Sequence, residues 1–285
     1  HSLQASAAKS LFTILTRQNS PHRYQPTLRE PTDVTSPRLH VATFNIHKGF
    51  SQFNRRMMVH ELRERLRSLN PDILFLQEVQ GLHLGHAESH QNWPAGSQHD
   101  FLAEDVWAAS AYGRNMVYDH GHHGNAILSR FPILHSHNQD VTHLRFEKRG
   151  LLHCRIELPE GPAAHCVCVH LSLFGYSRRK QMTALADHIE QMAEPNSPLI
   201  IAGDFNDWSN SAGLQLTRRL GLSEVFSNRD GTPACSFPAA RPMFRLDRIY
   251  VRGFDVKQTE VHHGLPWSAI SDHAALSAHL ARHGG

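Results

Sequence analysis

Short apolar runs that end in acidic, amide or imidazole side chains are the feature that most constrains this chain. Acids seldom lie in apolar runs without a partner, and carboxylates gathered by a fold repel one another unless a cation lies between them. The runs therefore predict strands that carry a hard-metal hydrolytic site, with phosphate esters as the natural substrates. Six segments show the pattern: 43–45, 76–78, 169–172, 203–206, 271–273, and 246–250 with Asp247 in its interior.

The length and composition fit a globular protein of one large domain or two small ones. The chain has 285 residues, of which 40% are hydrophobic and 19% charged. Its formal net charge of +3 is too small to indicate a polyanionic partner. No stretch approaches the roughly 18 apolar residues of a membrane span, so no transmembrane segment is expected. The four cysteines, expected to be buried and unpaired, favour a reducing, cytoplasmic location.

Residues 1–37 differ from the rest and are predicted to form an N-terminal extension. Its residues 20–37 are rich in Pro, Thr and Ser, and a short amphipathic helix is predicted before them. The apolar face of that helix would consist of Leu11, Phe12, Ile14 and Leu15. A helix docked on the domain is the simpler interpretation. The alternative is a weak contact of residues 3–17 with a membrane surface, which would make the protein peripheral to a membrane.

Residues 38–283 are predicted to form the catalytic domain. Periodicity predicts helices at 55–69 and around 182–192, and an insertion with one helix at 80–113. Strands are predicted at 39–45, 73–76, 114–118, 124–129, 132–138, 151–158, 164–171, 199–202 and 246–251. Two strand–helix–strand stretches are thus separated by consecutive strands. This order favours two packed sheets with helices outside them.

Asp204 and Asn206 are the most informative pair. They follow a buried strand directly and lie two residues apart, so in extended chain they share a face. The amide is suited to holding a phosphate oxygen and the carboxylate to accepting a proton from water. A simple Asx turn is the structural alternative.

The segment 271–273 supplies Asp272 and His273, whose side chains normally diverge because they are adjacent. His273 is therefore expected to pair with a distant acid, and Asp247 is the candidate. A buried Asp that accepts from an imidazole N–H fixes its tautomer and raises its basicity. An ordinary pair of Asp247 with Arg245 or Arg248 is the alternative.

The other candidates are weaker when each is taken alone. Glu78 and Asn45 end strands and are expected to face a cleft, although a capping Glu and a turn Asn would show the same pattern. His170 also ends a predicted strand. Arg149 would contact phosphate oxygens in a bidentate manner, but a solvated charge cluster with Glu147 explains it equally well.

Taken in order, these motifs resemble the endonuclease/exonuclease/phosphatase (DNase I-like) superfamily over residues 39–281. Within it the chain looks most like a bacterial group of uncharacterised metal-dependent hydrolases. The resemblance rests on the combination of 76–78, 203–206 and 271–273, and on the group's segments 45–49, 112–115, 121–126 and 203–208. It implies an α/β fold, a four-layer α/β/β/α sandwich of two packed mixed sheets.

The resemblance also implies roles for individual residues. Mg²⁺ or Mn²⁺ would be held or oriented by Asn45 and Glu78, with Asp272 beside the metal. Asp204 and Asn206 would position water and phosphate. Three groups complete the expected site: Asp247 orients the catalytic His273, His170 is the second catalytic histidine, and Asn125 with Arg149 binds substrate.

The expected function is phosphoester hydrolysis by in-line attack of water, as a phosphodiesterase or phosphatase in the class of phosphoric ester hydrolases. The substrate would be a nucleic acid, a phospholipid headgroup or a small phosphoester, and the protein is expected to be a monomer. A DNA or RNA nuclease is the main alternative, although His47 stands where repair nucleases of the family often carry an Asp. A catalytically inactive binding protein on the same scaffold is the alternative from another class.

Overall fold

The computed structural model describes residues 38–50, 57–83, 96–119 and 121–283. The predicted extension 1–37, including residues 3–17, lies outside the described residues. The start of the predicted helix 55–69 also lies outside them. Within the described part of the chain, no helix is both long enough and apolar enough to span a bilayer.

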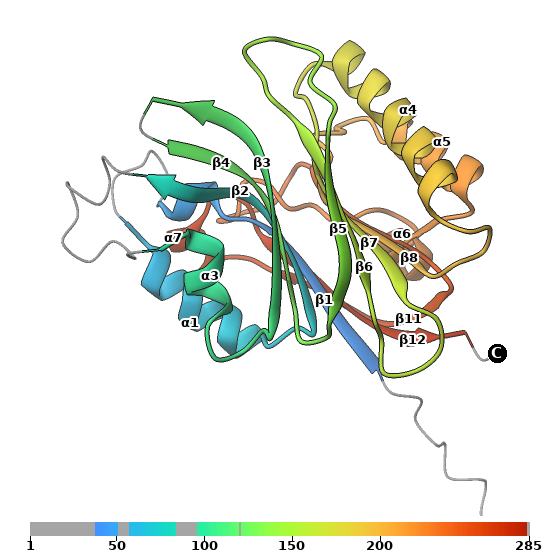
Figure 1. The fold of residues 1–285 in the computed structure, drawn as a ribbon, viewed down its shortest axis with the longest axis horizontal. Coiled ribbons are helices and arrows are strands. Elements are labelled where there is room, and N and C mark those ends of the chain that lie inside the picture. The colour runs from blue at the N-terminus through green and yellow to red at the C-terminus, as the bar shows by residue number, and fades with distance from the viewer. Residues whose placement is uncertain (1–37, 51–56, 84–95, 120, 284–285) are drawn as a thin grey trace, which may run out of the picture. The chain divides into compact units, whose positions relative to one another are not determined.

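The first sheet has six strands in the order β11-β12-β1-β2-β4-β3 (Figure 1). β1 runs parallel to β2 and antiparallel to β12, so the sheet is mixed. The strands are β1 (Arg38–Asn45), β2 (Ile73–His83), β3 (Ala109–Tyr118), β4 (Gly121–Ser129), β11 (Phe254–His262) and β12 (Ala275–Arg282).

The second sheet also has six strands, in the order β5-β6-β7-β8-β10-β9. β7 runs parallel to β8, whereas the other pairs are antiparallel. The strands are β5 (Ile133–Asp140), β6 (Gly150–Ile156), β7 (Ala164–His170), β8 (Leu199–Asp204), β9 (Ser223–Glu224) and β10 (Asp247–Arg252).

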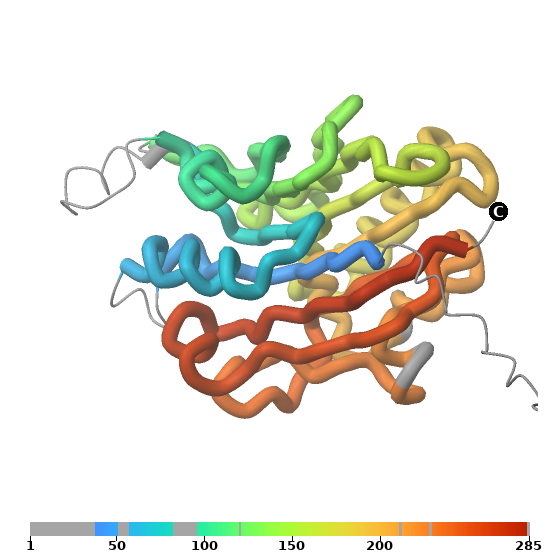
Figure 2. The backbone as a smooth tube through the Cα atoms, turned by 90° about the horizontal axis from the view of Figure 1, so that it is seen from below, coloured from blue at the N-terminus to red at the C-terminus, as the bar shows by residue number. Residues whose placement is uncertain are grey.

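Helices cover the outer face of each sheet (Figures 1 and 2). On the first sheet they are α1 (Val59–Leu69), α3 (Gln98–Ala103) and α7 (Trp267–Ile270), and on the second α4 (Gly175–Met192) and α5 (Ser211–Leu220). Two further short elements are η1 (His47–Gly49) and α6 (Val225–Asp230). In α1, Leu62 and Leu66 are buried one turn apart, and the helix ends where Asn70 adopts the left-handed conformation.

Three hydrophobic cores within the described residues separate four layers. One core joins the two sheets, with Phe75 from β2 and Ile249 from β10. A second lies between the first sheet and α1, where Leu62 packs with Phe44. The third lies between the second sheet and α4, where Leu185 contributes. The structure therefore confirms the predicted four-layer α/β/β/α sandwich of two mixed sheets.

The cysteines of the second sheet lie in the core between the sheets, as expected, whereas Cys235, also expected to be buried, is free and only partly buried. Cys154, Cys166 and Cys168 are free and fully buried, although Cys154 lies directly opposite Cys166 in the β6–β7 ladder. Burial raises the pKa of the Cys168 thiol to about 12, which keeps it protonated and unreactive.

Three buried histidines form a chain of hydrogen bonds on the outer face of the second sheet. His153 Nδ1 lies 2.9 Å from His188 Nε2, and His153 Nε2 lies 2.9 Å from His165 Nδ1. His165 Nε2 in turn lies 3.3 Å from the Glu194 carboxylate. Burial, together with the neighbouring histidines, lowers the pKa of His153 to about 3.

We expect this chain of histidines to make the fold sensitive to acid. The unfolded chain binds more protons than the folded one between the lowered pKa of His153 and its ordinary value of 6.5. Stability therefore falls as the pH falls through that window, by about 2 kcal/mol from pH 6.5 to pH 5 for this one group. Chemical denaturation at several pH values will measure it, and His153→Gln will show a shallower pH dependence than the wild type. His263→Gln, at an exposed position, is the control. Equal slopes in all three proteins would contradict the assignment.

Candidate active site

The strand registers bring the polar strand ends together. Asn45 lies opposite Gln77 in the parallel β1–β2 pair, so Glu78 follows directly at the same sheet end. In the second sheet, Asp204 of β8 lies opposite His170 of β7 on one side and Asp247 of β10 on the other. The packed sheets place this row against the Asn45–Glu78 end of the first sheet, because side chains from both ends line one pocket.

That pocket has a volume of about 250 Å³. Most of the side chains around it are charged or hydrogen-bonding groups. They are Asn45, Lys48, Glu78, His123, Arg149, His170, Leu173, Asp204, Asn206 and His273. Seven of the ten residues predicted for the site thus line one pocket, although they come from both sheets and from segments more than 200 positions apart.

Asp204 lies at the centre of the contacts. Its Oδ2 accepts a hydrogen bond of 3.2 Å from the Asn45 amide and lies 3.6 Å from Nε2 of His170 and 3.8 Å from Nε2 of His273. Its Oδ1 accepts from the backbone N–H of Asn206 at 2.9 Å. Asp204 is buried, so these neighbours determine its orientation and charge.

A backbone feature holds Asp204 in place. Gly203 has φ of +146°, and a Cβ there would meet the Val169 carbonyl oxygen at 2.0 Å. Only glycine allows β7 and β8 to approach this closely one residue before Asp204. Asn206, also at positive φ, donates from Nδ2 to the Leu171 carbonyl at 3.0 Å, which ties the loop after β8 to the end of β7.

His273 pairs with Asp247, as the sequence led us to expect. Nδ1 of His273 lies 2.8 Å from Oδ2 of Asp247, and both side chains are buried. The Ser271 hydroxyl accepts from the His273 backbone N–H and donates to the Asn45 carbonyl at 2.7 Å. This second contact joins the segment before β12 to the end of β1 and places Nε2 of His273 toward Asp204.

Burial and charge give the two histidines and Asp204 different protonation states. Burial alone would lower the pKa of His273, but the carboxylates of Asp247, Asp204 and Asp272 raise it to about 10. Burial, followed by the charge of Arg149, holds the pKa of His170 well below its usual range. Burial and the Asp247 carboxylate raise the pKa of Asp204 to about 6. At neutral pH His273 is therefore an imidazolium, His170 is a neutral imidazole and Asp204 is a carboxylate.

Glu78 and Asn45 form the opposite side of the pocket. The Asn45 amide nitrogen lies 3.4 Å from Oε1 of Glu78, while its oxygen accepts from the backbone N–H of His47 at 3.1 Å. Asn45 thus orients two acids, Glu78 and Asp204. Glu78 has φ of +56°, an unusual backbone conformation for a glutamate that turns its side chain into the pocket.

Cationic groups form a third side. Arg149 has each guanidinium nitrogen hydrogen-bonded, to the Leu171 and Lys148 carbonyls and to Glu147 at 3.0 Å, so its position is fixed. Lys48 and His123 lie beside it on the pocket surface. Burial and the nearby Lys48 charge lower the pKa of His123 to about 4, so it is neutral at pH 7.

Three predicted site residues do not line the pocket. Asp247 lies behind His273. Asp272 is partly exposed, and its Oδ1 lies 3.5 Å from Nδ1 of His47. Asn125, predicted to bind substrate, is buried in β4 and donates from Nδ2 to the carbonyls of Gly150 and Cys168. Asn125 therefore links the two sheets beneath the pocket.

The carboxylate groups of the pocket are suitable ligands for a hard cation. The Glu78 carboxylate faces the pocket with only the Asn45 amide as a hydrogen-bond partner in the described structure, and carboxylate oxygens are the ligands that Mg²⁺ and Mn²⁺ prefer. Candidate ligand atoms of Asp204, Asp247 and His273 also lie within 4.8 Å of one another. In that trio, however, Oδ2 of Asp247 and Nδ1 of His273 are already paired with each other, and both residues are buried whereas Glu78 is partly exposed in the pocket, so Glu78 is the better position for a metal.

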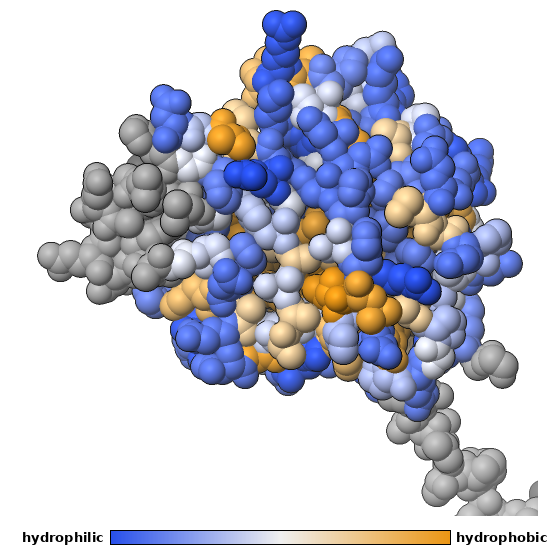
Figure 3. All heavy atoms as spheres, viewed as in Figure 1, coloured by the Kyte–Doolittle hydropathy of each residue, from blue (hydrophilic) through white to orange (hydrophobic). Residues whose placement is uncertain are grey.

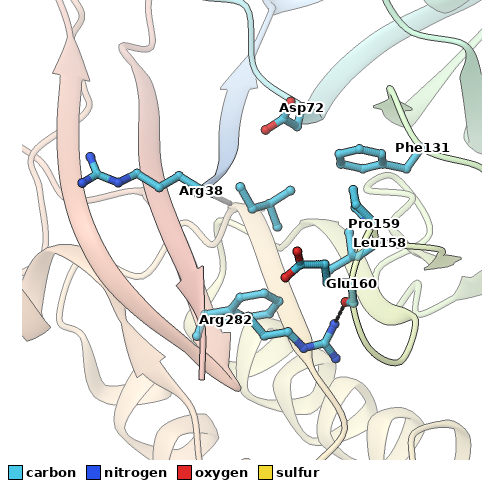
Figure 4. Close-up of a pocket in the computed structure, with 9 residues that line it drawn as sticks. Arg38, Asp72, Phe131, Leu158, Pro159, Glu160 and Arg282 are labelled. Carbon is cyan, nitrogen blue, oxygen red and sulfur yellow. Dashed lines mark hydrogen bonds between the residues drawn. The ribbon is translucent and has the colours of Figure 1, made fainter. Parts of the chain in front are cut away.

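A second pocket lies at the opposite end of the strands (Figure 4). It has a volume of about 150 Å³, and its lining includes Arg38 at the start of β1 and Arg282 at the end of β12. The Arg282 guanidinium donates to the Glu160 backbone carbonyl. Its lining is mostly apolar and holds no histidine, so the chemistry favours the first pocket as the active site.

Lys48, His123 and Leu173 line the pocket but were not among the residues predicted for the site. Lys48 and His123 lie in segments 45–49 and 121–126, which carry the resemblance, but nothing in their spacing distinguishes them from surface residues. Lys48 is placed by the turn that follows β1, and His123 is placed by the pairing of β3 with β4. Periodicity reveals neither feature.

Comparison with known sequences identifies related proteins. A profile of the Endonuclease/Exonuclease/phosphatase family matches residues 42–273. Uncharacterized protein YbhP of Escherichia coli strain K12 is 46% identical over 241 residues, which cover 84% of this chain and 95% of that protein.

Solved structures share the fold at low sequence identity. The structure of an endonuclease/exonuclease/phosphatase from Beutenbergia cavernae superimposes with a TM-score of 0.70 at 20% identity, covering 87% of this chain and 72% of that one. A mannosyl-6-phosphatase of Bacteroides thetaiotaomicron gives 0.65 at 17% identity, with 85% and 99% covered. At these identities the likeness establishes the four-layer architecture.

Proposed function

Because the chain belongs to the endonuclease/exonuclease/phosphatase family, we propose that it is a divalent-metal-dependent hydrolase of phosphoesters, acting as a phosphodiesterase or phosphatase. Members of this superfamily generally hydrolyse phosphoesters. The observation that carries the proposal is one arrangement: Asp204 lies between two histidines and faces Glu78 across a pocket whose third side is cationic.

The residues divide into groups with different tasks. Asp204 and Asn206 hold the attacking water in line with the phosphorus, and Asp204 accepts its proton. His273, charged and backed by Asp247, donates to a phosphoryl oxygen and neutralises its developing charge. His170 is neutral and lies on the far side of Asp204, where it contacts the leaving oxygen.

Mg²⁺ or Mn²⁺ is the expected cofactor, held by Glu78 with Asn45 as the orienting group and Asp272 nearby. When bound, it would supply charge neutralisation at the phosphoryl oxygens. Arg149 and Lys48 bring two positive charges to the same pocket, which suits an anionic phosphate group. We assign Arg149 to substrate binding and Asn125 to supporting the sheet ends beneath it.

The nuclease alternative has less support from the run 178–180 and from the size of the pocket. The basic run 178–180 lies in the first turns of α4, but Arg178 is buried and donates to the carbonyls of Ser172 and Leu173. A nucleic-acid groove needs a row of exposed cations that follows the backbone. The compact 250 Å³ pocket is better matched to a single phosphoester group.

A substrate panel tests the proposal. Plasmid DNA, RNA, phospholipid vesicles, inositol phosphates and a chromogenic phosphodiester are each incubated with Mg²⁺, Mn²⁺ or chelator. We expect metal-dependent release of phosphate or alcohol from at least one small or lipid phosphoester. Turnover of plasmid or RNA alone would assign the chain to the nucleases, and turnover in chelator would contradict the metal requirement.

A further inference from the structure

Large apolar side chains are exposed around the mouth of the catalytic pocket. They form two clusters, which we call together the apolar rim. The first is Phe146, Leu173, Phe174 and Tyr176, and the second is Trp208, Met243 and Phe244; each is between 42% and 68% exposed. Exposed apolar groups gathered at one place on a surface mark contact with a partner or a membrane.

Contacts between two loops hold the side chains of the first cluster in place. Phe146, from the β5–β6 connection, contacts Phe174, from the β7–α4 connection, edge to face at 5.9 Å. Buried Glu147 joins the two connections, since its carboxylate accepts from the Leu173 backbone N–H and from the Ser172 hydroxyl. The exposed rings therefore stand on a fixed base, and Leu173 also lines the pocket itself.

The second cluster lies on the other flank of the same sheet end. Trp208 follows β8, two residues after Asn206, and contacts Phe244 edge to face at 5.1 Å. Phe244 and Met243 precede β10. In the strand order β5-β6-β7-β8-β10, the ends of β7 and β8 with their catalytic residues lie between the two clusters.

The apolar rim carries positive charge. Exposed basic side chains next to it are Arg145, Arg179, Lys180, Arg241 and Arg245. Lys180 Nζ lies 5.3 Å from the ring centre of Tyr176. In segments 141–149 and 171–180, the single acid is Glu147, which is buried and paired with Arg149. Figure 3 shows hydrophobic residues beside strongly hydrophilic ones at the top of the view, over the β5–β6 connection.

We propose that the apolar rim docks the protein on the surface of a bilayer containing anionic phospholipids. Apolar side chains would enter the boundary between headgroups and acyl chains, and the flanking basic residues would contact lipid phosphates. Leu173 and Met243 favour a bilayer over single-stranded nucleic acid, because aliphatic side chains offer no ring face for a base. The pocket then opens toward the membrane surface.

Vesicle co-sedimentation of the full chain tests the docking. Chelator is present throughout, so that hydrolysis plays no part, and vesicles of neutral phosphatidylcholine are compared with vesicles that also contain phosphatidylglycerol. We expect binding to the anionic vesicles, weakened by salt, and a loss of about tenfold or more in the double variant Phe146→Ser/Phe174→Ser. Arg179→Gln should weaken binding by about fivefold.

Two controls make the result specific. Leu134→Ser removes an equally exposed apolar side chain at the start of β5, away from the pocket, and should bind as the wild type does. Phe146 and Phe174 do not line the pocket, so the double variant should keep wild-type turnover of any small soluble phosphoester that the protein hydrolyses. Unchanged vesicle binding in the double variant would overturn the proposal. So would an absence of binding to anionic vesicles, or binding of a single-stranded oligonucleotide that the double variant loses.

Discussion

Replacing Asp204 by Asn is expected to lower turnover by about 10³-fold or more while leaving the fold intact. Asparagine has the same shape and keeps a carbonyl oxygen for the backbone N–H of Asn206. It cannot accept a proton from water, and it removes the charge that faces both His170 and His273. Steady-state kinetics on the best substrate of the panel will show the loss in kcat.

Asp255→Asn is the matched control, because it removes a carboxylate on the exposed start of β11, at the end of the strands away from the pocket. It should retain wild-type activity. Circular dichroism and thermal unfolding will show that Asp204→Asn folds. Near wild-type turnover by a folded Asp204→Asn protein would remove Asp204 from the catalytic residues.

Asp247→Asn is expected to lower turnover by about 10²- to 10⁴-fold, although Asp247 does not line the pocket. The carboxylate accepts the Nδ1 proton of His273 at 2.8 Å, which fixes the ring and presents Nε2 to the pocket. It is also the strongest of the three charges that raise the pKa of His273 to about 10. With Asn in its place, His273 loses its proton at a lower pH.

The pH–rate profile separates this positioning role from a purely structural one. In the variant, the alkaline decline of kcat should begin at a lower pH than in the wild type, because the charged form of His273 is lost earlier. A structural defect alone would lower kcat without moving the profile. An unmoved alkaline limb with full activity would contradict the dyad.

Short-range patterns of apolar residues predicted the strands and the helix faces that are buried. Continuous apolar runs such as 199–202 are strands buried on both faces, and the spacing of Leu62 and Leu66 marks the buried face of α1. The pairing of His273 with Asp247 could also be predicted, because an acid inside an apolar strand needs a partner and the sequence offers few candidate partners.

The features of the fold that were not predicted depend on the pairing of strands far apart in the sequence. β12 has the sequence ALSAHLAR, which lacks the β-branched and aromatic residues typical of strands. It nevertheless pairs with β1 and β11, because its position completes the first sheet. β2 continues to His83 through the positive φ of Glu78, where the pattern of apolar residues stops. Similarly, Asn125 belongs to segment 121–126, from which His123 reaches the pocket, but its own side chain points into the interior and contacts the second sheet.

Dependence of turnover on a divalent cation distinguishes a metal-dependent hydrolase from any other use of this pocket. Turnover of the best phosphoester is measured against Mg²⁺ concentration, after chelation, for the wild type and for Glu78→Gln. The amide keeps the size of Glu78 and lacks the anionic oxygen that a hard cation prefers. We predict no turnover in chelator, full recovery with Mg²⁺, and a Mg²⁺ requirement raised about tenfold or more in the variant. Undiminished turnover by the wild type in chelator would show that the hydrolysis needs no metal.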